Sequence, residues 1–118
     1  MEQQSNMAES ILQFKEGLAH LSHTLPTYAE KFNEFTEECF KEGAVSAKQK
    51  QLIALGISVK AQDEYCIIFH TKGCIDQGCT EQEIMETIAV SSAFGGGASI
   101  SQGVTLVQSC INEFKPLN

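Results

Sequence analysis

The sequence predicts an all-helical fold, and three features of the chain lead to that prediction. Apolar residues recur at a spacing near 3.6 along most of its length, which places them on one side of a helix. No run of Val, Ile or Thr alternates at period two for long enough to form a convincing strand. Residues that commonly cap helices precede the apolar segments. We therefore expect one domain, covering residues 1–118 and built from about six helices.

The first helix is expected to begin near Asn6, because Asn6 and Glu9 have the spacing of a capping box. Its apolar stripe consists of Ile11, Phe14, Leu18 and Leu21. Pro26 ends this helix and is well placed in the first turn of a second one. The apolar face of the second helix consists of Tyr28, Phe32, Phe35 and Cys39. Gly43 is the expected end of this second helix.

Two further helix starts follow in the middle of the chain. Ser46 and Gln49 form a capping box that opens a third helix. This helix carries Leu52, Ile53, Leu55, Gly56 and Val59. Asp63 is the expected N-cap of a fourth helix, and Gly78 is its expected end.

The last part of the chain predicts a broken pair of helices. Thr80 and Glu83 repeat the capping pattern and open a fifth helix through Ile84, Ile88 and Phe94. The three glycines 95–97 break it. A sixth helix is expected from about Ala98 to Phe114, with one apolar stripe made of Ile100, Val104, Val107 and Ile111.

Composition narrows the classes of partner and compartment. The net charge of −7 and the lack of any Lys or Arg cluster argue against a surface for nucleic acid or anionic membrane. The first residues carry no basic cluster and no apolar core of a targeting signal, so a cytoplasmic location is expected. Five cysteines are an odd number, which in a reducing compartment favours buried or reactive thiols over disulfides.

No charged residue occurs from Thr87 to Asn112. This stretch is long enough for a membrane span of about 20 residues, but its three glycines and many Ser, Thr and Gln residues favour helices buried against protein. A chain of this length has little surface of its own to cover two such helices on both sides. We therefore expect a homo-oligomer, although a simple central hairpin of the core would explain the same pattern.

The start of the fourth helix holds the residues best suited to chemistry. With Asp63 as the cap, Cys66 lies in the first helical turn, where free amides and the helix dipole stabilise a thiolate. His70 is one turn further on the same face and could accept the thiol proton. The charges of Asp63 and Glu64 and the apolar neighbours oppose this by raising the thiol pKa. The sequence leaves open which effect is larger, and a buried inert Cys66 is the alternative.

Cys66, His70 and Cys74 also share one stripe, which suggests a metal site. A rise of about 1.5 Å per residue separates the two sulfur positions by ~12 Å along the axis, which is too far for one zinc ion. The same separation excludes a disulfide between them within an intact helix. The glycine run lacks the Lys and Ser/Thr of a phosphate loop, so neither a metal nor a cofactor is expected.

Residues from Lys50 to about Gln102 resemble the carboxymuconolactone decarboxylase and alkylhydroperoxidase D-like superfamily. The resemblance rests on an ordered set of segments: Leu52-Ile53-Ala54-Leu55, Glu64-Tyr65-Cys66-Ile67 with His70, the run from Gly78 through Thr80 to Glu83-Ile84 and Glu86, and Phe94-Gly95-Gly96-Gly97. It implies an AhpD-like helical bundle that assembles into rings, commonly trimers or hexamers.

The peroxide-linked branch of this superfamily carries CxxCxxxH on the matching helix and a relay Glu on the preceding one. Cys66 and His70 match the second Cys and the His, whereas Asp63 replaces the first Cys and Gln51 stands at the relay position. A carboxylate role would then pass to Asp63 or Glu64. The resemblance implies a peroxiredoxin-like antioxidant oxidoreductase with a one-Cys cycle, in which Cys66 attacks a hydroperoxide and an external thiol restores it.

Two other functions remain open. The decarboxylase branch has no thiol at this position, and there His70 would act as acid or base on a small carboxylated lactone, with Lys72 as the only cation near the motif. Loss of both the first Cys and the relay Glu would also suit a non-catalytic oligomeric scaffold. Selective modification of Cys66 at neutral pH distinguishes a redox site from such a scaffold.

Overall fold

The computed structural model describes the backbone of residues 2–115 and the side chains of residues 7–115, and within this part of the chain it contains helices and no strand. The predicted all-helical class is thus confirmed. The elements are α1 (Glu2–Thr24), α2 (Pro26–Phe40), α3 (Ala47–Ala61), α4 (Glu64–Asp76), α5 (Glu81–Gly95), α6 (Gly97–Gln102), the π-helical turn η1 (Gly103–Val107) and α7 (Gln108–Phe114). The elements α6, η1 and α7 follow one another without a break and form one continuous helical segment, which we call the last rod. Counted in this way, the described residues form six helical segments, in agreement with the six or so helices predicted.

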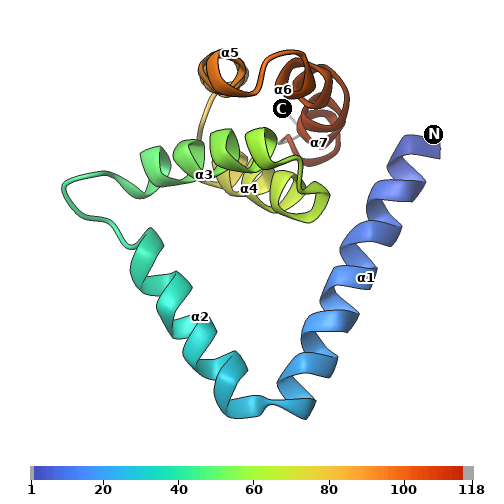
Figure 1. The fold of residues 1–118 in the computed structure, drawn as a ribbon, viewed down its shortest axis with the longest axis vertical. Coiled ribbons are helices and arrows are strands. Elements are labelled where there is room, and N and C mark those ends of the chain that lie inside the picture. The colour runs from blue at the N-terminus through green and yellow to red at the C-terminus, as the bar shows by residue number, and fades with distance from the viewer. Residues whose placement is uncertain (1, 116–118) are drawn as a thin grey trace.

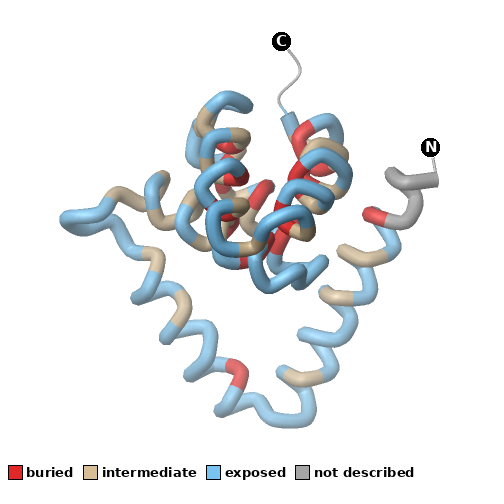
Figure 2. The backbone as a smooth tube through the Cα atoms, turned by 45° about the horizontal axis from the view of Figure 1, so that its top comes forward, coloured by how far each residue is buried: buried red, intermediate tan, exposed pale blue. Residues whose placement is uncertain are grey.

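The helices form two parts of different character (Figure 1). The first two, α1 and α2, make a V whose point lies at the Thr24–Pro26 junction, while α3 to α7 pack together at its open end. Buried residues gather in the α3–α7 part, and most of the V is exposed (Figure 2). The main core consists of Leu55, Val59, Ile67, Cys74, Ile84, Ile88, Val107 and Ile111. None of the helices in residues 2–115 has the length and hydropathy needed to cross a membrane.

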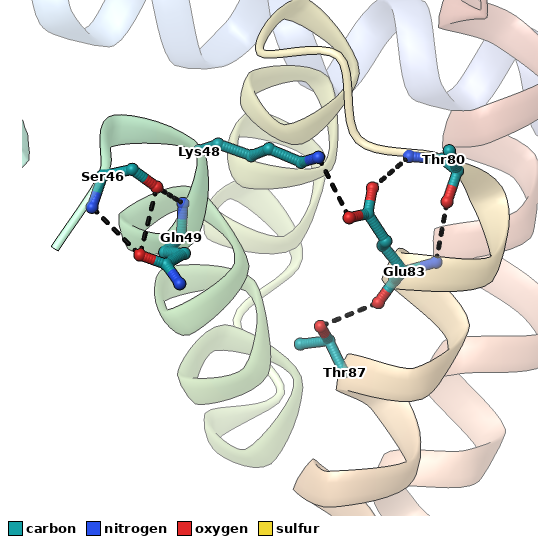
Figure 3. Close-up of polar contacts among 6 residues, drawn as sticks. All are labelled: Ser46, Lys48, Gln49, Thr80, Glu83 and Thr87. Carbon is teal, nitrogen blue, oxygen red and sulfur yellow. Dashed lines mark hydrogen bonds and ion pairs between the residues drawn. The ribbon is translucent and has the colours of Figure 1, made fainter.

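Three predicted helix starts are confirmed in atomic detail. Ser46 and Thr80 each cap a helix through a full capping box, with Gln49 and Glu83 as the reciprocal partners (Figure 3). Asp63 caps α4 by accepting a hydrogen bond from the Cys66 amide. Figure 3 also shows an ion pair between Lys48 and Glu83, with Nζ and Oε2 3.0 Å apart, which joins the first turns of α3 and α5.

Two expected boundaries are wrong. The first helix begins at Glu2, so the backbone of Asn6 already lies inside α1, and the Asn6 side chain lies outside the described part. The second helix ends at Phe40 and not at Gly43, because Lys41 turns to an extended conformation with φ −65° and ψ 141°. The start of α2 at Pro26 is confirmed.

The expected apolar stripe of the last rod is half wrong. Val107 and Ile111 are buried, but Ile100 and Val104 are 44% and 64% exposed. Small residues take their place against α5: Ser99 is buried, and a Cβ on Gly103 would collide with Ile88. The π turn widens the helix at residues 103–107, so a strict 3.6 period does not describe which side chains face inward.

Candidate functional site

The first turn of α4 positions Asp63 and Cys66 against each other. Asp63 Oδ1 accepts a hydrogen bond of 3.1 Å from the Cys66 amide, as expected of an N-cap. The Cys66 residue is exposed. Glu64 turns away from this contact, since its Oε2 accepts a 2.8 Å hydrogen bond from Ser10 Oγ of α1. Of the two carboxylates considered from the sequence, Asp63 is therefore the one next to the sulfur.

The surroundings of Cys66 favour the neutral thiol. Partial burial raises the pKa of Cys66, and the charge of Asp63 together with its hydrogen bond raises it further. Both effects raise the pKa, as expected from the acidic and apolar neighbours of Cys66. They oppose the helix dipole, which stabilises a thiolate and lowers the pKa. At neutral pH the sulfur therefore keeps its proton, and any nucleophilic role needs a base.

His70 is fixed by a contact with Gln51 of α3. Nδ1 of His70 and Oε1 of Gln51 are 3.0 Å apart. Because an amide oxygen can only accept, Nδ1 donates, and the lone pair of the neutral ring then lies on Nε2. Burial lowers the pKa of His70, so the ring is neutral at pH 7 and its Nε2 can accept a proton.

Two aromatic rings hold the imidazole plane. The Phe40 ring stacks on His70 with a centroid separation of 5.4 Å and an interplanar angle of 18°. The Phe69 ring meets it edge-on at 5.6 Å and 80°. The described contacts of the His70 side chain are with Phe40, Gln51 and Phe69, and no hydrogen bond joins it to Cys66.

Gln51 can reach His70 because residue 73 has no side chain. A Cβ on Gly73 would collide with the amide group of Gln51. Neither the structural role of Gly73 nor the position of Phe40 in the site was predicted from the sequence. A glycine in the middle of a helix indicates the close approach of another group, so the sequence could have indicated the role of Gly73. The position of Phe40 at the end of α2 had no comparable signal.

A groove of about 810 Å³ lies beside this arrangement and includes Gln51 in its wall. Its other lining residues are Ile11, Phe14, Lys15, Leu18, Tyr65, Ile68, Phe69, Lys72, Gly73, Asp76, Gln77 and Phe114. Phe14 stacks on Tyr65 with centroids 5.4 Å apart, which brings α1 against α4. Lys72 Nζ forms a 2.8 Å ion pair with Asp76 Oδ2, while Lys15 adds a second positive charge.

The structure thus divides the predicted site residues into two contacts. Asp63 is bound to Cys66 at the start of α4, and Gln51 is bound to His70 one turn later. Glu64 belongs to neither contact. Among the described residues, no group of three or more His, Cys, Asp or Glu side chains has an arrangement suited to a metal ion. What the arrangement offers is a protonated thiol and a neutral, oriented base on one helix.

The chain is similar to a family of known proteins, to an uncharacterized protein and to a protein named as a decarboxylase. The sequence model of the carboxymuconolactone decarboxylase family matches residues 26–109. An uncharacterized protein of the cox locus of Paracoccus denitrificans is 35% identical over 68 residues, covering 58% of this chain and 61% of that protein. The nitrosuccinic acid decarboxylase npaB of Metarhizium robertsii is 30% identical over 66 residues, covering 56% of this chain and 46% of the decarboxylase. The chain thus spans less than two thirds of the length of either relative.

A solved structure has the same fold over nearly the whole chain. The crystal structure of apo-lpg0406, a carboxymuconolactone decarboxylase family protein from Legionella pneumophila, superposes with a TM-score of 0.88 at 25% identity and covers 94% of this chain and 98% of its own. The family model covers most of the sequence, and this fold agrees with it. The chain therefore belongs to the carboxymuconolactone decarboxylase family.

Proposed function

We propose that this protein reduces hydroperoxides with Cys66 as the nucleophile and His70 as its base. The observation that supports the proposal best is the protonation state of the pair. The pKa of Cys66 is raised and that of His70 is lowered. At neutral pH the helix therefore carries a protonated thiol and, one turn further along, a neutral imidazole. This is the starting state of general-base catalysis, in which the base removes the proton as the nucleophile attacks.

The chemistry balances as follows. Nε2 of His70 takes the thiol proton while the Cys66 sulfur attacks the terminal oxygen of a hydroperoxide. The O–O bond breaks, the sulfur becomes a sulfenic acid, and the departing alkoxide receives the proton from His70 to leave as an alcohol. An external thiol then condenses with the sulfenic acid to release water, and a second thiol reduces the mixed disulfide to restore Cys66.

Gln51 and Asp63 have separate roles in this proposal. Gln51 holds Nδ1 as a donor and thereby keeps the lone pair on Nε2. A neutral amide, unlike a carboxylate, does not stabilise the imidazolium. Asp63 keeps Cys66 protonated between turnovers, which protects the sulfur from unselective oxidation. Asp63 and Gln51 are therefore positioning residues and not proton carriers.

Trapping of the oxidised sulfur tests the proposal. The intact protein is exposed to one equivalent of cumene hydroperoxide together with dimedone, which forms a stable adduct with sulfenic acids. We expect the adduct on Cys66 and at least an equal amount of cumyl alcohol. Cys39 is a matched control, because its thiol is also exposed but no imidazole lies near it in the sequence. An adduct distributed equally over Cys39 and Cys66 would contradict the proposed site.

A second function is supported by the groove beside Gln51. Lys15 and Lys72 make this groove suitable for a small carboxylate, and the family contains a relative named as a nitrosuccinic acid decarboxylase. His70 would then act as acid or base and Cys66 would be a bystander. Decarboxylation of a small dicarboxylic acid that persists in Cys66→Ser and disappears in His70→Gln would favour this function over peroxide reduction.

We also infer that the protein acts as a homo-oligomer of the ring type. In one chain, Tyr28, Phe32 and Phe35 of α2 are 55%, 50% and 62% exposed, which is a large apolar face for a monomer. A second apolar groove of about 490 Å³ runs between α3 and α5, with Ile57, Val90 and Phe94 among its exposed walls. A trimer or hexamer in sedimentation equilibrium supports this inference, and a monomer at micromolar concentration contradicts it.

A further inference from the structure

The end of α4 brings two other cysteines together. Gly78 has φ +83° and donates its N–H to the carbonyl of Ile75 at 3.0 Å. The N–H of Cys79 donates to the carbonyl of Cys74 at 2.9 Å. This pair of hydrogen bonds is the Schellman ending of a helix, in which a residue beyond the turn packs against the third residue from the helix end. Here both packing positions are cysteines.

The backbone geometry is compatible with a disulfide. The N–H of Cys79 and the carbonyl of Cys74 are directly bonded, and standard bond lengths then limit the separation of the two Cα atoms to ~7 Å. Disulfides require Cα atoms within about that distance. The two side chains also lie close enough for each thiol to influence the pKa of the other. Both cysteines are free thiols in the structure.

The two sulfurs differ in access, which gives them different roles. Cys74 is fully buried in the main core, whereas Cys79 is half-buried and packs on the edge of the same core. Burial raises the pKa of the Cys79 thiol and the charge of Glu83 raises it further, while the Cys74 thiol and the charge of Lys48 act in the opposite direction. An oxidant therefore meets Cys79 first, and Cys74 is already in contact with it.

We propose that Cys74 and Cys79 are a redox-active dithiol that a hydroperoxide converts to a disulfide. The Cys79 sulfur attacks the terminal peroxide oxygen, the O–O bond breaks, and the alkoxide leaves as an alcohol with the thiol proton of Cys79. The Cys74 sulfur then displaces hydroxide from the sulfenic acid of Cys79, which forms the S–S bond and releases water with the Cys74 proton. The two thiols supply both electrons, and an external dithiol then reduces the disulfide to the two thiols and is itself oxidised to a disulfide.

This dithiol is separate from the site at Cys66. It lies at the opposite end of α4 from Cys66 and uses neither His70 nor Gln51. Oxidation would link the end of α4 to the residue just before Thr80, whose capping box begins α5. Oxidation would therefore change the covalent structure at the junction of α4 and α5, whether or not Cys66 reacts.

Peptide mapping of the intact Cys66→Ser protein tests the proposal. The protein is treated with hydrogen peroxide, its remaining thiols are alkylated, and it is cut before aspartates and after glutamates. Cys74 and Cys79 then fall on different peptides, because Asp76 lies between them, and Cys74 is the only cysteine on its own peptide. We expect these two peptides to be joined, two titratable thiols to be lost, and dithiothreitol to restore both.

Two variants sharpen the result without altering the buried core. In Cys79→Ser made in the same background, Cys74 should remain an alkylatable thiol after peroxide, whereas Cys39→Ser should leave the joined peptides unchanged. The proposal is overturned if Cys74 and Cys79 stay alkylatable while Cys39 is oxidised. It is also overturned if Cys79 proceeds to a sulfinic acid with Cys74 still free.

Discussion

Gln51 Oε1 lies 3.0 Å from Nδ1 of His70, so a neutral amide holds the imidazole. The contact joins α3 to α4 and depends on the absence of a side chain at Gly73. It fixes which ring nitrogen carries the proton and leaves Nε2 as the base.

Gln51→Glu should raise the pKa of His70, which is below 6.5 in the native protein. A carboxylate has nearly the same shape as the amide, but its charge stabilises the imidazolium. A histidine titration by NMR measures the change directly. An unchanged His70 titration in this variant would show that residue 51 does not face the ring in solution.

The lowered pKa of His70 also makes stability depend on pH. The unfolded chain binds the His70 proton more readily than the native one, because its pKa is the ordinary value near 6.5. The contribution of His70 should therefore be constant above about pH 6.5 and should decrease the unfolding free energy as pH falls below that value. Urea denaturation across this range should show the decrease in the native sequence and a smaller one in His70→Gln. Equal slopes in both proteins would contradict the assignment.

Gly73→Ala should displace the Gln51 amide group from His70, because a Cβ at residue 73 would collide with it. The displacement should cost little stability, since the colliding atoms are the far end of a flexible side chain. Gly17→Ala is the matched control, since nothing lies within 4 Å of a Cβ there in the exposed part of α1. That control should stabilise the helix by ~0.5–1 kcal/mol, the usual difference between Gly and Ala in a helix. The His70 titration measured by NMR should change in Gly73→Ala and not in Gly17→Ala, and an unchanged titration in Gly73→Ala would contradict the tight contact.

Asp63→Asn should increase the reactivity of Cys66 while leaving α4 intact. The substitution removes the negative charge that raises the Cys66 pKa, and Asn is as good an N-cap as Asp. Alkylation by iodoacetamide at pH 7 should become roughly threefold to tenfold faster, because the thiolate fraction grows as the pKa falls. Asp76→Asn, which removes a carboxylate paired with Lys72, should leave the rate unchanged. A slower reaction in Asp63→Asn would mean that Asp63 assists the thiolate.

Local signals in the sequence predicted much of the fold and part of the site. The caps at Ser46, Asp63 and Thr80 were predictable because each hydrogen bond joins residues three positions apart. The same reasoning placed Cys66 in the first turn of α4. The start of α1 was missed because the spacing of Asn6 and Glu9 suggested a cap where the helix simply continues.

Long-range packing set the features that could not be predicted. The inward face of the last rod depends on how closely Gly103 approaches Ile88 and on the π turn, and neither follows from an apolar period. The stacking of Phe40 on His70 joins the end of α2 to the middle of α4, which only the three-dimensional arrangement of the helices decides. The contact between Cys74 and Cys79 is local in sequence. It was not predicted because it requires a turn after α4 in which Gly78 has a positive φ.

The most direct test of the proposed function uses Cys79→Ser protein, in which Cys74 and Cys79 cannot form a disulfide. It compares hydroperoxide reduction by this protein, and by Cys66→Ser and Cys39→Ser made in the same background, with an excess of a small thiol reductant. Cys39 and Cys66 are both exposed, but only Cys66 lies on the same helix as His70, one turn away from it. We expect Cys66→Ser to lose turnover, Cys39→Ser to keep the rate of the Cys79→Ser protein, and His70→Gln to lose about 10²-fold or more, as for a general base. An unchanged rate in Cys66→Ser would contradict the role of Cys66 as the nucleophile.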